Sequence, residues 1–94
     1  MPGFRLLQNY PNPFNPSTRI RFEIPSSSRV RLTVLDALGR ERALLADGDK
    51  ARGVYEVDFV PKDLESGVYF CRIDIRETGT GKIEFRTIKL IISK

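Results

Sequence analysis

Residues 8–16 read Gln-Asn-Tyr-Pro-Asn-Pro-Phe-Asn-Pro, directly before the first regular strand pattern of the chain. Each proline in this stretch fixes φ near about −65° and lacks an N–H group, so neither a helix nor a central strand forms there. The residue before each proline is pushed toward extended or turn geometry. Because Tyr10 and Phe14 are large apolar side chains, we expect them to pin a stiff, ordered loop to the edge of a domain.

Alternating apolar and polar side chains predict β-strands through most of the remaining chain. The segments with this pattern are 18–24, 29–34, 41–46, 55–59, 68–76 and 82–92. A seventh strand fits the same spacing, in which turn residues recur about every eight to twelve positions. The pattern therefore predicts an all-β fold, and in particular an Ig-like antiparallel β-sandwich of about seven strands.

The connections between these strands can also be predicted. Residues 36–39 read as a type I turn that ends in a left-handed glycine. Residues 47–53 are polar and contain two glycines, so we expect a loop there. In the last strand Ile83 and Phe85 are out of phase with the apolar residues that follow, which predicts a bulge or a bend near residues 86–87.

The same segments resemble a known family, the type A C-terminal sorting domain of type IX (Por) secretion cargo. The resemblance starts with the loop and first strand at residues 7–25 and extends over about residues 6–94. Three shorter pieces follow in the order that the family has, at Val34–Arg40, Leu64–Phe70 and Thr87–Ile92.

This resemblance implies a function in protein export. Such a domain directs a larger secreted protein through the periplasm and across the outer membrane of a Gram-negative bacterium, to the medium or the cell surface. The implied partners are the outer-membrane type IX translocon and a sortase-like cysteine peptidase. That peptidase removes the domain by cleavage upstream of Leu7, and the cargo is then attached to anionic lipopolysaccharide. The chain would be the recognised and cleaved partner, not the catalyst.

The length of 94 residues fits one domain. We expect residues 1–5 to be a cloning remnant or a linker and residues 6–94 to form the sorting domain. The first five residues lack the apolar core of a signal peptide, which for a secreted family predicts a piece of a longer protein. No apolar run approaches the roughly 20 residues that a membrane-spanning helix needs, so we expect no transmembrane segment.

The composition argues against an enzyme. With no histidine and one cysteine, the chain has neither a Cys/His zinc site nor a His-based triad. It also lacks the glycine-rich motifs that bind nucleotide phosphates. Asp47 and Asp49 are too few for the roughly six to eight oxygen ligands of calcium. We therefore expect no catalytic residue, cofactor or metal site, and we expect Cys71 to be a small core residue.

Two segments are candidates for recognition by the secretion machinery. The first is the loop, with the candidate residues Asn12, Pro13, Phe14, Asn15 and Pro16. The alternative is that this loop only covers the edge of the first strand. The second is the C-terminal strand, where we expect Leu90 to be buried and Lys89 and Lys94 to be exposed. A partner would read the strand edge or the free carboxylate there, whereas the alternative is a strand that only closes a sheet.

Gly67 and Tyr69 match the central motif of the family, and they are candidates for the same recognition. A structural interpretation is preferred for both. We expect Gly67 to adopt a φ angle that other residues resist. We expect Tyr69 to bury its ring and to form a hydrogen bond through its hydroxyl at a corner of the fold.

Arg19, Arg21, Arg29 and Arg31 would point to one side of a sheet if the first two predicted strands pair. Like charges opposite each other destabilise a sheet, so something must offset them. The simpler candidates are acidic residues of the chain itself, namely Glu23, Glu56, Asp58 and Asp74. The alternative is an external anion, such as a lipopolysaccharide phosphate or an acidic translocon surface. We expect no nucleic acid, because the aromatic residues look buried rather than arranged for base stacking.

Two further function classes remain as alternatives. One is a structural Ig-like module similar to that of flagellar hook-capping proteins, which have comparable Asn-Pro-Phe-Asn-Pro openings. The other is a carbohydrate-binding accessory module. That class needs exposed aromatic residues on one face, whereas this chain has no tryptophan and its tyrosines are expected to face inward.

Overall fold

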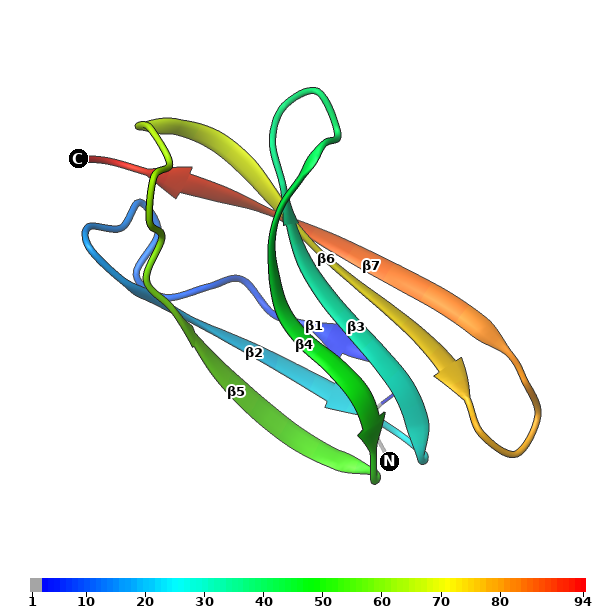
Figure 1. Cartoon of the computed structure of the whole chain (residues 1–94). Coiled ribbons are helices and arrows are strands. Elements are labelled where there is room, and N and C mark those ends of the chain that lie inside the picture. Colours follow the sequence, from blue (N-terminus) through cyan, green and yellow to red (C-terminus); the bar gives the residue numbers. More distant parts are fainter. Residues whose placement is uncertain (1–2) are drawn as a thin grey trace.

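A computed structural model describes residues 3–94, and the regular structure in this range is entirely β-strand. The strands are β1 (Arg5–Leu6), β2 (Thr18–Ile24), β3 (Ser28–Leu35), β4 (Glu41–Lys50), β5 (Gly53–Phe59), β6 (Gly67–Glu77) and β7 (Ile83–Ile92). They form two antiparallel sheets that pack as a sandwich (Figure 1). The prediction of an all-β, Ig-like sandwich of about seven strands is confirmed.

The two sheets have different widths. The smaller sheet has the strand order β1-β2-β5, and the larger has the order β4-β3-β6-β7. β2 and β3 follow each other in the chain but lie in different sheets, because residues 25–27 carry the chain across the sandwich. The assumption that the first two predicted strands pair is therefore wrong. β2 pairs with β5, and β3 pairs with β4 and β6.

The core lies between the inner faces of the two sheets. Along β2 and β3 every second residue is buried, as the period-two pattern predicts. Burial of one such large apolar side chain stabilises a fold by about 1.5–3 kcal/mol. The fully buried apolar side chains are Phe14, Ile20, Phe22, Ile24, Val30, Leu32, Val34, Cys71, Ile73 and Leu90.

β4 is longer than the sequence predicts. It continues to Lys50, so the loop predicted at residues 47–53 is reduced to a turn at residues 51–52. The strand also contains irregular register against β3, with shifts between Leu32 and Thr33 and between Val34 and Leu35. Polar and glycine-containing sequence resembles a loop, but it can form an edge strand whose outer groups face solvent.

The bulge predicted near residues 86–87 is absent. The pairing of β6 with β7 is continuous from Gly67 opposite Ile92 to Arg76 opposite Ile83. Ile83 and Phe85 instead lie on the outer face, where their exposed fractions are 69% and 54%. The change of phase therefore marks apolar residues on the outer face, not an extra residue in the strand.

The sandwich includes part of the stretch expected to be a cloning remnant or a linker. Met1 and Pro2 lie outside the described residues. Phe4 is buried in the core cluster, and Arg5 of β1 pairs with Glu23 of β2. The packed unit thus begins at Phe4, while the origin of residues 1–5 stays a prediction.

Candidate functional site

The N-terminal loop, residues 7–17, joins β1 to β2 at the end of the molecule where the C-terminus lies (Figure 1). Its hydrogen bonds link the smaller sheet to β7 of the larger sheet. It first runs beside β2, where Tyr10 and Arg19 exchange two backbone hydrogen bonds of 3.0 and 2.9 Å. It then crosses to β7. There the Phe14 N–H donates to the Ile91 carbonyl and the Ser93 N–H donates to the Phe14 carbonyl, both at 3.0 Å.

Polar side chains of the loop add hydrogen bonds to β7, and two of these bonds are donated by side-chain amides in a segment whose prolines have no N–H. Asn12 Oδ1 accepts a hydrogen bond from the Ile91 N–H at 2.9 Å. The Asn12 Nδ2 and Gln8 Nε2 groups both donate to the Lys89 carbonyl, at 3.4 and 2.8 Å. The backbone groups along this part of the β7 edge are therefore paired with the N-terminal loop.

Asn9 holds the internal shape of the loop. Its side chain is almost fully buried and donates to Thr18 Oγ1 at 2.9 Å and to the Pro11 carbonyl at 3.1 Å. Thr18 Oγ1 in turn donates to the same carbonyl at 2.7 Å. These bonds tie the start of the loop to the first residue of β2.

The two aromatic residues of the loop have opposite environments. Phe14 is buried, with its ring centroid 6.1 Å from that of Phe59 on β5. Tyr10 is 71% exposed, because its bridge partner Arg19 occupies an outward-facing position of β2. The expectation that both aromatics pin the loop is correct for Phe14 and wrong for Tyr10.

The side chains of the C-terminal strand are buried or exposed as the sequence predicts. Leu90 and Ile92 are buried, whereas Lys89 and Lys94 are exposed. The Lys94 N–H donates to Ser66 Oγ at 3.0 Å, which ties the end of the chain to the β5–β6 connection. Because the N-terminal loop pairs with β7 near Ile91, a partner can reach this segment through its side chains but not through its covered edge.

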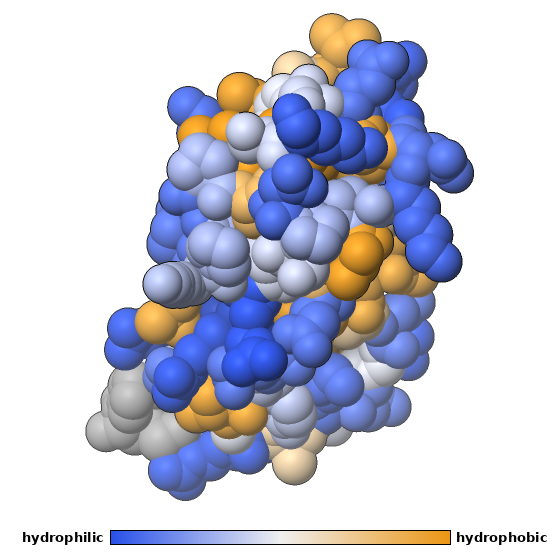
Figure 2. Space-filling model, turned by 90° about the vertical axis from the view of Figure 1, so that its left-hand side faces the viewer, coloured by the Kyte–Doolittle hydropathy of each residue, from blue (hydrophilic) through white to orange (hydrophobic). Residues whose placement is uncertain are grey.

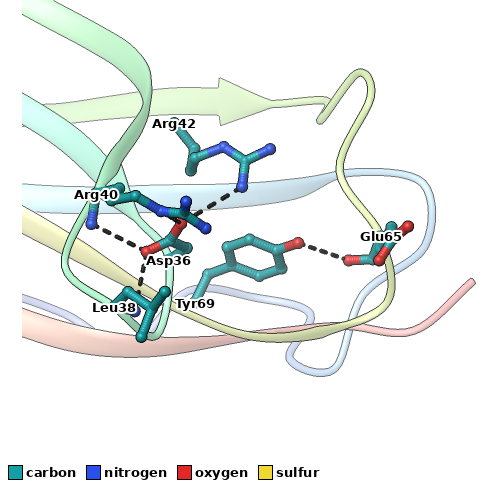
Figure 3. Close-up of polar contacts among 6 residues, drawn as sticks. All are labelled: Asp36, Leu38, Arg40, Arg42, Glu65 and Tyr69. Carbon is teal, nitrogen blue, oxygen red and sulfur yellow. Dashed lines mark hydrogen bonds and ion pairs between the residues drawn. The ribbon is translucent and has the colours of Figure 1, made fainter.

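Tyr69 forms the predicted corner contact (Figure 3). Its ring is buried, and its hydroxyl donates to the Glu65 carbonyl at 2.8 Å. Gly67, two residues earlier, has a φ of 152°, in a region that favours glycine. Both residues thus fix the start of β6, which is the structural interpretation preferred from the sequence.

Asp36 closes the hairpin between β3 and β4, a role that the sequence pattern did not identify (Figure 3). Its carboxylate accepts hydrogen bonds from the backbone N–H groups of Leu38 and Arg40, both at 2.9 Å, and from Arg40 Nε at 2.8 Å. Burial raises the pKa of Asp36, but these bonds outweigh it and lower the pKa to about 2. Gly39 has the left-handed φ of 82° that the turn prediction requires.

The four candidate arginines do not form one anion-facing surface. Arg19 and Arg21 lie on β2, whereas Arg29 and Arg31 lie on β3 in the other sheet. Acidic residues of the chain pair with three of them. The ion pairs are Arg19–Asp58 at 3.0 Å, Arg29–Asp47 at 3.1 Å and Arg31–Glu41 at 2.8 Å. The hydrogen bond to Asp58 also raises the pKa of Arg19.

Metal ligands and accessible thiols are scarce in the part of the chain that the structure describes. Residues 3–94 contain no group of three or more histidine, cysteine or acidic side chains able to hold a metal ion. Cys71 is buried, and this burial raises the pKa of its thiol to about 12. Residues 3–94 include no helical segment that could span a membrane.

The fold and the site define a β-sandwich domain in which the N-terminal loop and the C-terminal strand form one structural unit. The chain belongs to the family of secretion system C-terminal sorting domains, whose model matches residues 8–92. It is therefore a type IX sorting domain, a class of signal that serves secretion across the bacterial outer membrane or display at the cell surface.

Among solved structures, the chain is similar to CopC from Methylosinus trichosporium OB3b. The sequence identity is 16% and the TM-score is 0.54, over 96% of this chain and 93% of that chain. At this identity the similarity concerns the fold alone. A comparison with curated proteins gave no match.

The two loop aromatics provide a matched test of how the loop is held. We expect Phe14→Ala to lower the free energy of unfolding by about 3–5 kcal/mol, because it leaves a cavity beside Phe59. We expect the control Tyr10→Ala to change it by about 0.5 kcal/mol or less, because that ring is exposed. Urea unfolding followed by circular dichroism measures both values. Equal losses in the two variants would contradict this account of the loop.

The lowered pKa of Asp36 predicts that the stability of the domain depends on pH. Its pKa is about 2 in the folded protein, below the usual 3.8, so its stabilising contribution is complete above about pH 4 and is lost as the pH falls toward 2. The Asp36→Asn variant lacks this contribution at every pH. We therefore expect the wild type to unfold at higher urea concentration than the variant at pH 7, and the two midpoints to converge near pH 2. A constant difference between the midpoints would exclude this role.

Proposed function

We propose that this chain is a non-catalytic signal at the C-terminus of a larger secreted protein, which it directs through the periplasm and across the outer membrane of a Gram-negative bacterium. Membership of the sorting-domain family over residues 8–92 is the observation that carries the proposal. The independent core of the domain supports it, because a signal that folds by itself can be attached to many different cargo proteins.

The type IX translocon, in this proposal, reads side chains at the end of the sandwich that joins the loop to β7. Pro13, Asn15 and Pro16 are exposed there, as are Lys89 and Lys94. Figure 2 views the molecule from this side, and its hydrophobic residues lie scattered among hydrophilic ones. A polar surface with two lysines suits reversible binding, because charge complementarity contributes to the rate and specificity of encounter.

A sortase-like cysteine peptidase then removes the domain, and the cargo is joined to anionic lipopolysaccharide. The chain is the substrate of this step, since it has no histidine and its one cysteine is buried. The scissile bond lies upstream of Phe4 in this proposal. A protease needs an extended, accessible backbone, whereas Phe4 is buried and Arg5 and Leu6 pair with β2.

An export assay tests the proposal. The whole chain is fused behind a reporter that carries its own signal peptide and is expressed in a type IX host. We expect the reporter to reach the medium or the cell surface with the wild-type domain. We expect the double variant Lys89→Glu, Lys94→Glu to leave it in the periplasm, because both lysines are exposed parts of the recognised surface.

The matched control is Arg52→Glu, an exposed charge reversal in the turn between β4 and β5, at the opposite end of the molecule (Figure 1). We expect this variant to be exported normally. Retention of the reporter by the wild-type domain would refute the sorting function and favour a structural Ig-like module. Normal export of the double variant would refute only the assignment of the recognised surface.

A further inference from the structure

A hollow of about 530 Å³ lies on the outer face of the smaller sheet, where the N-terminal loop runs beside β2. Its volume is within the range of about 300–1,000 Å³ that small-molecule sites occupy. Leu7, Tyr10 and Pro11 form one side, and Arg19 and Arg21 of β2 also line it. Gln8, which donates to the Lys89 carbonyl, also lines the hollow, whereas neither Lys89 nor Lys94 does.

Tyr10 is an exposed aromatic ring on a fixed backbone. Its N–H and its carbonyl are both hydrogen-bonded to Arg19, so the point from which the ring projects is held in place. The neighbouring Asn9 side chain is buried and fully engaged in the loop. An aromatic ring presented in this way gives a large apolar contact at small entropic cost, because few rotatable bonds must be ordered on binding.

The other side of the hollow is polar and already positioned. Asp58 Oδ1 accepts from Arg19 Nε at 3.0 Å, and Glu56 Oε2 lies 4.0 Å from Arg19 Nη1. Arg21 lines the same hollow, and among the described residues no carboxylate lies within 4.0 Å of its guanidinium. The guanidinium of Arg21 therefore has N–H donors available for a ligand.

These features select the chemistry of the ligand. Two arginines and two carboxylates cancel in charge, so neither an anion nor a cation is favoured as a whole. Hydroxyl groups, which both donate and accept, match a wall that contains donors and acceptors together. The C–H face of a sugar ring carries weak positive charge and packs on the negative face of an aromatic ring.

The geometry points to a binding site for a neutral saccharide in the hollow beside Tyr10. One sugar ring packs on Tyr10, while its hydroxyl groups bond to Arg21 and to the carboxylates that hold Arg19. Two properties of the sequence disfavour the carbohydrate-binding alternative, the absence of tryptophan and the expectation that the tyrosines face inward. The exposure of Tyr10 removes the second of them. This site is independent of the proposed sorting function.

Titration of the full chain with sugars, followed by ¹⁵N–¹H NMR, tests this inference. The probes are trisaccharides of glucose, mannose, galactose and N-acetylglucosamine, each to about 20 mM. We expect saturable shifts at the amides of residues 7–21 and 54–59 for at least one probe. We expect Tyr10→Ala to weaken that binding about tenfold or more and Tyr10→Trp to preserve it, while Arg52→Ala leaves it unchanged.

Saturable binding that requires the Tyr10 ring supports the site. The absence of saturable shifts with every probe would overturn it, as would binding that Tyr10→Ala does not weaken. Binding only to a uronic acid or phosphorylated trisaccharide, added as a fifth probe, would overturn the neutral character of the site. A folded Tyr10→Ala spectrum, with unchanged shifts outside residues 7–21 and 54–59, ensures that lost binding reflects the ring and not unfolding.

Discussion

Hydrogen bonds between the N-terminal loop and the last strand are the constraint on which this fold depends. Four backbone groups of the segment 89–93 are bonded to the loop, through Gln8, Asn12 and Phe14. A proline-rich segment is a poor edge strand because it lacks N–H groups. The Asn12 and Gln8 amide groups supply donors instead, to the Lys89 carbonyl, and buried Phe14 holds the loop against the core. The 89–93 part of the β7 edge is thereby covered, which keeps this segment from pairing with other chains.

The covered edge also explains why the two ends of the chain act together. The loop can reach its bonded position only when β7 is in place, and the edge groups of segment 89–93 are satisfied only when the loop is docked. The N-terminal signature of the family and its C-terminal strand are thus one structural unit. A truncated or unfolded chain does not present this unit, so recognition of its surface would distinguish a folded domain from an incomplete one.

The sequence predicted the elements of this structure better than their arrangement. Alternation identified the inner residues of β2, β3 and β6, because burial on one face imposes a period of two. The same pattern does not say which strands pair, so the placement of Arg29 and Arg31 in the second sheet was missed. The second half of β4 was missed because an edge strand tolerates polar residues and glycine. The opposite environments of Tyr10 and Phe14 depend on pairing with Arg19 and Ile92, partners that local sequence does not reveal.

Amide hydrogen exchange at Ile91 and Ser93 is the most direct measurement of the central contact between loop and strand. Both N–H groups are bonded to the loop, so the account predicts that they exchange far more slowly than the amide of Gly79 in the exposed β6–β7 turn. The Asn12→Ala variant removes the acceptor for Ile91 and should accelerate exchange there, while amides in the centre of β6 stay protected. Exchange of Ile91 and Ser93 in the wild type as fast as that of Gly79 would contradict the account.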